Sequence, residues 1–154
     1  MLILFVCTGN TCRSPIAAAI ARRVAQERGL AHVELASAGT SAVEGQPASD
    51  GALLVGIERQ LDLTEHRARQ LTPELVESAD LVLVMGPHHL ERVEALGGAG
   101  RAYLLTDYAT RTSDGRPVGD PFGGALDVYR ATVDELESEI QRAVDRLATE
   151  RAPS

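Results

Sequence analysis

The sequence predicts a single α/β domain, a three-layer sandwich in which a central four-stranded parallel sheet carries helices on both faces. Four short apolar segments, at residues 2–6, 33–37, 80–85 and 102–105, alternate with longer stretches of helical character. Such alternation is typical of a parallel sheet that is covered on both sides. The chain has 154 residues, a length that suits one domain with a sizeable core.

The first strand and the helix after it follow from local signals. Residues 2–6 are all apolar, as in a strand that is buried on both faces. Ser14 is a suitable N-cap and Pro15 suits a first helical turn, so we expect a helix from there until Gly29 ends it. The second strand follows at residues 33–37.

Shorter elements make up the middle of the chain. After a polar loop, we expect Pro47 to open a helix over residues 47–60. Thr72 is a suitable cap for a short helix over residues 73–78. Residues 80–85 are again apolar after their first position and form the third strand.

The last third of the chain contains the longest loop and the longest helix. A helix over residues 88–96 precedes the strand at 102–105. Residues 106–124 form a loop rich in Gly, Asp and Pro, and loops of this length tend to be functional. Residues 125–149 place apolar side chains at helical spacing and form the final helix.

The composition excludes several classes of protein. The formal net charge is −7, which argues against a general binder of nucleic acid or of anionic membranes. The apolar segments are far too short to span a bilayer, and the N-terminus lacks the basic flank of a signal peptide. We therefore expect a cytoplasmic protein with free thiols, by default a monomer, whose domain spans residues 1–150 with a frayed tail at 151–154.

The segment between the first strand and the first helix predicts a pocket for an oxyanion. It reads Cys-Thr-Gly-Asn-Thr-Cys-Arg-Ser, and its glycine and asparagine allow the backbone to curl. Inward-pointing N–H groups and the positive end of the helix that follows would then bind phosphate. Cys7 stands at the floor of this pocket as the candidate nucleophile. The phosphate-binding loop itself comprises Thr8, Gly9, Asn10, Thr11, Cys12, Arg13 and Ser14.

Cys7 and Arg13 carry the expected chemistry. A cysteine that is surrounded by loop amides and a guanidinium typically has a pKa of roughly 3.5–7.5 and reacts as a thiolate. Arg13 can hold two phosphate oxygens at once, which lysine cannot do, and the Ser14 hydroxyl can donate to the sulfur. The plainer alternative is that Cys7 only packs at a strand end. Neither the nucleotide P-loop nor the thioredoxin motif has this spacing.

These motifs together resemble the low-molecular-weight protein tyrosine phosphatase family. Residues 7–15 match its signature loop, 37–40 its second block, 80–85 its central strand and 120–123 its general-acid loop. The matches occur in the order of the family and cover nearly the whole chain. The resemblance implies a cysteine-dependent phosphatase that needs no metal or other cofactor and acts on a phosphorylated protein.

The resemblance also implies roles for residues outside the signature loop. Asp120 would be the general acid that protonates the leaving group and then, as a base, activates water. On spacing alone, Asp120 could equally be a turn residue before proline. Asn10, in a left-handed conformation, and Ser14 would join Ser37 and His66 in a hydrogen-bond network that holds the loop.

Thr11 and Phe122 bear on the choice of substrate, as residues of the substrate wall. Tyrosine-directed members usually carry a bulky aliphatic residue at the position of Thr11 and often a tyrosine pair where this chain has Phe122-Gly123. A threonine at this position instead resembles the bacterial protein arginine phosphatases, and its hydroxyl could orient water or a guanidinium. The sequence therefore favours phosphoarginine, with phosphotyrosine as the alternative.

Other interpretations of the loop are less favoured. Arsenate reductases of this fold need further cysteines downstream, and none follows Cys12. A non-catalytic phosphate-binding module would lack the nucleophile or the acid, and both are present. Cys12 either packs in the core or traps oxidised Cys7 as a disulfide, and the sequence leaves both open. His88 and His89 are expected on a solvated helix surface and not in a metal site.

Overall fold

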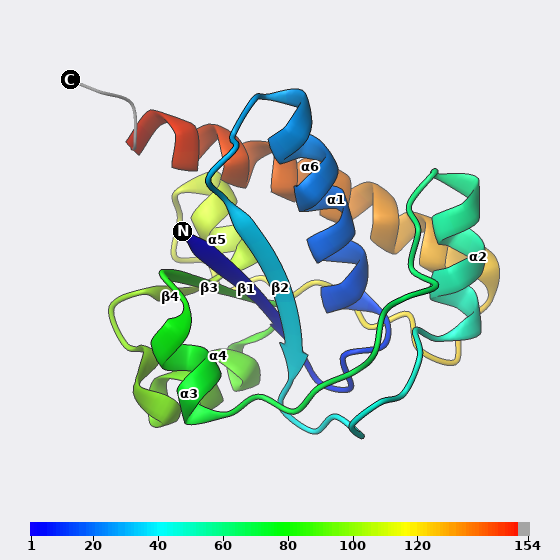
Figure 1. The fold of residues 1–154 in the computed structure, drawn as a ribbon, viewed down its shortest axis with the longest axis horizontal. Coiled ribbons are helices and arrows are strands. Elements are labelled where there is room, and N and C mark those ends of the chain that lie inside the picture. Colours follow the sequence, from blue (N-terminus) through cyan, green and yellow to red (C-terminus); the bar gives the residue numbers. More distant parts are fainter. Residues whose placement is uncertain (151–154) are drawn as a thin grey trace.

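The computed structural model describes residues 1–150, which form a three-layer α/β sandwich (Figure 1). Its central sheet has four parallel strands in the order β2-β1-β3-β4. The strands are β1 (Leu2–Cys7), β2 (Glu34–Gly39), β3 (Leu81–Val84) and β4 (Ala102–Leu104). The predicted fold class is confirmed, whereas the tail expected at residues 151–154 lies outside the described residues.

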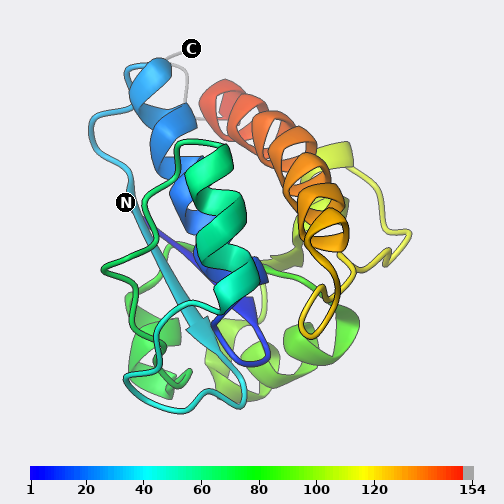
Figure 2. The same ribbon diagram turned by 90° about the vertical axis from the view of Figure 1, so that its right-hand side faces the viewer.

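Helices cover both faces of the sheet (Figure 2). One face packs against α1 (Arg13–Glu27), α2 (Asp50–Glu58), α5 (Leu105–Thr110) and α6 (Leu126–Glu150). The other packs against α3 (Pro73–Ser78) and α4 (Pro87–Val93), which a π-helical turn, η1 (Glu94–Gly98), extends. Within residues 1–150, we find no helix with the length and apolar character that crossing a membrane requires.

Strand β1 separates the two hydrophobic cores. Ile3 and Phe5 face the core beneath α1 and α6, whereas Leu4 and Val6 face the core beneath α3 and α4. Because both faces are buried, every position of this strand except its first excludes water. The chain runs from β1 to β2 on one side and then crosses to β3 on the other side of β1, and ligand sites form where the strand order reverses in this way, beyond the carboxyl ends of the strands. Cys7, the last residue of β1, lies there.

Two predicted helix starts are wrong. Helix α1 begins at Arg13 with Cys12 in the N-cap position, and no side chain caps it. Ser14 is therefore inside the helix, where its hydroxyl serves other partners. Helix α2 begins at Asp50 because the Ser49 side chain accepts the Ala52 N–H, so that Pro47 precedes the helix and does not open it.

The long loop and the fourth helix also differ from the prediction. The expected loop over residues 106–124 begins with α5, which starts where β4 ends, so the irregular segment is 111–125. Helix α4 ends its regular hydrogen bonding at Val93, and Gly97 turns the chain with a φ of 100°. These boundaries place α4 with one face turned toward the loop that follows β1.

Candidate active site

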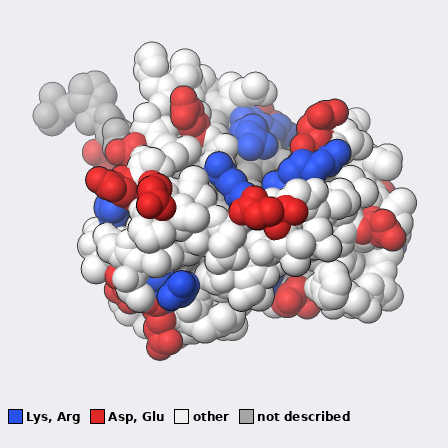
Figure 3. Space-filling model, turned by 60° about the horizontal axis from the view of Figure 1, so that its bottom comes forward, with Lys and Arg blue, Asp and Glu red and all other residues white. Residues whose placement is uncertain are grey.

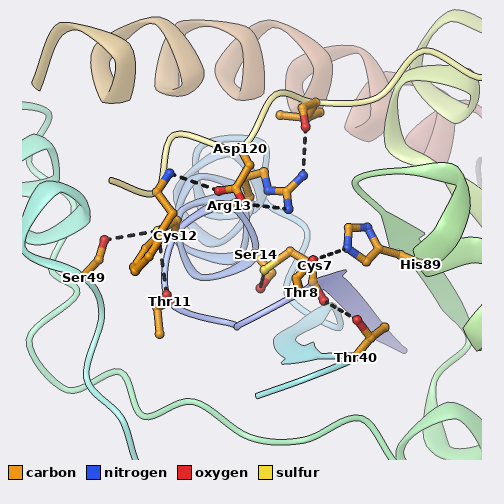
Figure 4. A network of polar contacts seen from close by, with 12 residues as sticks. Cys7, Thr8, Thr11, Cys12, Arg13, Ser14, Thr40, Ser49, His89 and Asp120 are labelled. Carbon is orange, nitrogen blue, oxygen red and sulfur yellow. Dashed lines mark hydrogen bonds and ion pairs between the residues drawn. The ribbon is translucent and has the colours of Figure 1, made fainter. Parts of the chain in front are cut away.

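The segment Cys7–Ser14 curls around a pocket of about 220 Å³ at the carboxyl edge of the sheet (Figure 4). Asn10 adopts the left-handed conformation, with a φ of 57°, as the sequence predicts. The pocket brings together eight of the candidate residues, which come from the loop and from the segment before α6. Its lining includes Cys7, Thr8, Gly9, Thr11, Cys12, Arg13, Asp120 and Phe122, together with Ser41, Val43 and Gln46.

Cys7 is buried at the floor of this pocket, with 3% of its surface exposed. Its Sγ lies 2.8 Å from Ser14 Oγ. Burial raises the pKa of the Cys7 thiol, while the Ser14 hydroxyl, the Ser14 and Asn10 amides and the Arg13 guanidinium act to lower it. The predicted lowering of the Cys7 pKa is therefore wrong, because the cost of burying a thiolate outweighs the effect of these groups.

Ser14 presents its hydroxyl hydrogen to Cys7 because of a second hydrogen bond. The Asn10 side-chain amide donates to Ser14 Oγ at 2.8 Å. With that oxygen accepting from Asn10, its own hydrogen points elsewhere, and Cys7 Sγ is the nearest acceptor; the Ala38 carbonyl is at 3.5 Å. Ser14 thus serves the nucleophile and not the end of the helix.

Arg13 is almost completely buried, and its guanidinium is held in two places. Nη1 donates to the Val118 carbonyl at 2.9 Å, and Nη2 lies 3.7 Å from Asp120 Oδ2. The Val118 amide in turn donates to the Met85 carbonyl at 2.8 Å, which ties the segment before α6 to the end of β3. The fork of Arg13 is thereby aimed into the pocket before any ligand enters.

Asp120 lies at the mouth of the pocket on the segment 111–125. Its Oδ1 accepts the Phe122 N–H at 3.1 Å, which fixes the turn at Pro121, while half of the side chain stays exposed. The arrangement provides a carboxylate on the side of the pocket opposite the Cys7 floor (Figure 4). A group in this place can exchange a proton with an atom that points out of the pocket.

Asn10 is the centre of the contacts that hold the loop. Its Oδ1 accepts the Arg69 amide at 3.0 Å, and its carbonyl accepts from His66 Nε2 at 2.6 Å. Burial lowers the pKa of His66, with Arg22, Arg67 and Arg69 lowering it further, whereas the hydrogen bond to Asn10 raises it. The hydrogen bond to the Asn10 carbonyl places His66 against the loop.

Ser37 lies near this network without joining it. Its side chain lines a shallow pocket together with His66, and its carbonyl accepts from Arg69 Nε at 3.0 Å. Within residues 1–150, the Ser37 hydroxyl makes no hydrogen bond to Asn10 or Ser14. The backbone of Ser37 and not its hydroxyl is what connects it to the segment that holds the loop.

Cys12 points away from the pocket floor into a small polar cluster beneath α6. Its Sγ lies 3.2 Å from Ser49 Oγ and 3.5 Å from the Tyr129 hydroxyl, and these two oxygens are 3.1 Å apart. Burial raises the pKa of Tyr129, with the Ser49 hydroxyl opposing this. Both cysteines are free thiols.

His89 is a residue of this site that the sequence reasoning missed. It was expected on a solvated surface, but its side chain is completely buried, and Nε2 lies 2.8 Å from Thr8 Oγ1. Only His88 is exposed as expected. Among residues 1–150 there is no cluster of three or more His, Cys, Asp or Glu side chains that could hold a metal ion.

The profile of the family described as low molecular weight phosphotyrosine protein phosphatase matches residues 2–152. The chain belongs to this family. It is a cysteine-dependent phosphatase of the low-molecular-weight type. The family that the sequence motifs predict is therefore confirmed.

Three relatives show how this low-molecular-weight phosphatase compares with known proteins. The protein-arginine-phosphatase of Bacillus subtilis is 40% identical over 153 residues, which cover 98% of this chain and 99% of that protein. The low molecular weight protein-tyrosine-phosphatase PtpB of Staphylococcus haemolyticus is 39% identical over 137 residues, which cover 88% and 92%. A solved C7S mutant of the YwlE arginine phosphatase, with a phosphorylated active-site serine, has a TM-score of 0.90 and 38% identity, and 98% of each chain is covered.

Proposed function

We propose that this phosphatase removes the phosphoryl group from phosphoarginine in proteins through a phosphocysteine intermediate. The observation that carries the proposal is the wall of the pocket above Cys7. Thr11 contributes a small, hydroxyl-bearing side chain to this wall, and Phe122 is its one aromatic residue within the described part of the chain. A phosphotyrosine ring needs apolar or aromatic walls on both of its faces, and a guanidinium does not.

Polar groups around the pocket suit a planar cation. Asp120 stands at the mouth with its side chain exposed, where its carboxylate can pair with the guanidinium that is released. Thr11 Oγ1 lies 3.7 Å from Cys12 Sγ, a weak contact that leaves the hydroxyl available to a ligand. The relatives named protein-arginine-phosphatase in Bacillus subtilis and YwlE arginine phosphatase support the same substrate.

In the first step, Cys7 reacts as the thiolate, the form that the Ser14 hydroxyl, the loop amides and Arg13 favour, and attacks phosphorus in line with the leaving nitrogen. The S–P bond forms as the P–N bond breaks, and Asp120 gives its proton to the departing guanidine nitrogen. Arg13 and the loop amides hold the three equatorial oxygens, whose charge they balance in the transition state. The products are an unphosphorylated arginine side chain in the protein substrate and phosphocysteine at Cys7.

In the second step, water hydrolyses the phosphocysteine. The Asp120 carboxylate accepts a proton from the water, whose oxygen bonds to phosphorus as the P–S bond breaks. Inorganic phosphate leaves, and the electron pair returns to Cys7 as a thiolate. The Ser14 hydroxyl, at 2.8 Å from the sulfur, stabilises that leaving thiolate.

Phosphotyrosine is the second candidate substrate. Phe122 is 69% exposed at the pocket mouth and could stack on a ring from one side. The relative named PtpB is a protein-tyrosine-phosphatase by name and is nearly as similar to this chain. The charges of the molecule do not decide between the two, since basic and acidic side chains stand next to one another on the face in Figure 3 without forming one basic field.

The deciding experiment compares kcat/KM for matched phosphoarginine and phosphotyrosine peptides, with Cys7→Ala as the blank. A preference for phosphoarginine that falls at least about tenfold in Thr11→Ile, a change of roughly 1.4 kcal/mol in transition-state binding, supports the proposal. A preference for the phosphotyrosine peptide in both the wild type and Thr11→Ile contradicts the proposal. If the ratio of the two kcat/KM values is the same in Thr11→Ile as in the wild type, Thr11 does not determine the substrate preference.

A further inference from the structure

Among the described residues, His89 makes the one side-chain hydrogen bond from α4 to the phosphate-binding loop. Its Nε2 lies 2.8 Å from Thr8 Oγ1 (Figure 4), and its side chain is completely buried. Thr8 lines the pocket directly after the nucleophile. A buried imidazole that ends on a pocket-lining hydroxyl has no part in the steps described above and calls for a reason.

The start of α4 explains how a histidine comes to be buried here. Gly86 and Pro87 open the helix after β3, and the His89 amide donates to the Gly86 carbonyl at 3.1 Å, so His89 lies in the first turn. The exposed His88 ring covers it, with ring centroids 3.8 Å apart. The first turn of α4 thus delivers the imidazole to the loop on a rigid element.

The imidazole reaches Thr8 as a neutral hydrogen-bond donor. Burial, with His88 and Arg13, lowers the pKa of His89 to about 4, although Asp120 acts to raise it. His89 Nδ1 is buried and has no partner among the described residues. A hydrogen on Nε2 leaves only a lone pair unsatisfied at Nδ1, whereas the other tautomer would bury an unpaired N–H, so the partners assign the hydrogen to Nε2.

The backbone of Thr8 does not depend on His89. The Thr8 carbonyl accepts the Ser41 amide at 2.9 Å, and the Cys7 carbonyl accepts the Thr40 amide at 2.9 Å. Main-chain bonds from the segment after β2 therefore already fix the course of the loop at this point. What His89 adds is the direction of the Thr8 hydroxyl.

We propose that His89 is a positioning residue, which donates to Thr8 Oγ1 so that the Thr8 hydroxyl donates its own hydrogen to a phosphoryl oxygen in the pocket. The proposal rests on the proposed function, because it needs a phosphoryl group above Cys7. The loop uses the same arrangement at Ser14, where the Asn10 amide donates to the hydroxyl that faces Cys7 Sγ. Two loop hydroxyls are thus oriented from outside, one toward the nucleophile and one toward its target.

A double-mutant cycle tests this pairing with His89→Leu, Thr8→Val and the double variant. The substrate is 4-nitrophenyl phosphate and the inhibitor is orthovanadate, neither of which depends on a preference for arginine. Losing one oriented donor should lower kcat/KM and weaken vanadate inhibition by about tenfold in each single variant. The double variant should be no worse than Thr8→Val alone, because both changes remove the same hydrogen bond to the ligand. A further tenfold loss in the double variant, or wild-type kinetics in His89→Leu, overturns the proposal.

Two further variants separate orientation from a purely structural role. His89→Gln can place an amide N–H near the position of Nε2 and should restore most of the vanadate affinity. His88→Gln alters the neighbouring histidine, which makes no hydrogen bond to the loop, and should change kcat/KM by less than about twofold. Failure of His89→Gln to restore inhibition, in a variant with wild-type Tm, overturns the proposal.

One measurement needs no variant that might unfold. The ¹⁵N NMR spectrum of wild-type protein at neutral pH should show His89 as the neutral tautomer with its hydrogen on Nε2, and this signal should shift when vanadate binds. A hydrogen on Nδ1 overturns the proposal. Wild-type protein that hydrolyses no phosphorylated substrate would instead contradict the proposed function, so the two failures are distinguishable.

Discussion

Asp120 Oδ2 lies 3.7 Å from Arg13 Nη2, yet the two side chains differ sharply in exposure, 52% for the aspartate and 7% for the arginine. The guanidinium is fixed from behind by the Val118 carbonyl. The carboxylate is open to solvent and to any group that enters the pocket. A long, half-exposed ion pair contributes little to stability, so what its geometry provides is the position of Asp120 at the mouth of the pocket.

Replacing Asp120 by asparagine should lower kcat/KM, which reports the step in which the leaving group departs, by roughly 10²–10³-fold, because general acid–base catalysis typically supplies gains of this order. The loss should be smaller for substrates with good leaving groups, which need no proton. Steady-state kinetics on a series of aryl phosphates measures this. Asp114→Asn, in the same irregular segment, is the matched control and should behave like wild type. An equal loss for every leaving group would refute the role of the acid.

Replacing Ser14 by alanine should raise the pKa of the Cys7 thiol further, since the Ser14 hydroxyl is one of the groups that act to lower it. The fraction of thiolate at any pH below that pKa then falls, and alkylation by iodoacetamide slows. The pH dependence of alkylation, followed at Cys7 by peptide mass spectrometry, measures the shift. A pKa equal to that of wild type would show that the 2.8 Å contact does not favour the charged sulfur.

Replacing Asn10 by alanine should lower the free energy of unfolding by about 2–4 kcal/mol. The variant loses buried hydrogen bonds and forces alanine into a left-handed conformation. Asn10→Gly should cost about 1 kcal/mol less, because glycine tolerates that φ. Urea unfolding measures both. Gln60→Gly, at an exposed position with a φ of 60°, controls for the backbone alone and should be nearly neutral or stabilising.

Replacing Phe122 by alanine should raise KM several-fold on protein substrates and leave Tm unchanged, because its ring is 69% exposed at the pocket mouth. A loss of roughly 1 kcal/mol corresponds to partial burial of the ring by the substrate. Ile57→Ala removes a similarly exposed apolar side chain, 73% accessible, outside the pocket. Equal effects of the two substitutions would mean that Phe122 is not part of the substrate wall.

Acid should destabilise the fold through His89. The pKa of His89 is about 4 in the folded protein and 6.5 in the unfolded chain. Between these pH values the unfolded chain therefore binds a proton that the native protein does not. Stability is therefore lost as the pH falls, by roughly 3 kcal/mol over that window. Urea unfolding at pH 7 and pH 4 should show a smaller loss in His89→Gln. Identical losses would assign the acid sensitivity to other groups.

The strand, the phosphate-binding loop and the fold class could be predicted because their signals are local. The apolar run of β1 is continuous because both of its faces are buried, and the left-handed Asn10 follows from a residue type that tolerates a positive φ. The general position of Asp120 followed from the family motif, since it lies on the segment that precedes the last helix.

The remaining parts of the site depend on contacts that no local pattern encodes. His89 was expected on a solvated helix surface, and only the docking of α4 against the loop buries it. Ser14 looked like a helix cap because Ser before Pro is a common start signal, but the helix begins two residues earlier, with Cys12 in the N-cap position. The partner of Arg13 is the Val118 carbonyl. Because every residue has a backbone carbonyl, the sequence does not show which one accepts this hydrogen bond.

The bond between Arg13 and the Val118 carbonyl joins the beginning of the chain to its last third. During synthesis, Cys7 and the loop emerge first, but the Arg13 guanidinium cannot bond to the Val118 carbonyl until residue 118 has left the ribosome. The ordered position of the Arg13 side chain in the pocket therefore depends on two segments that lie 105 residues apart in the sequence.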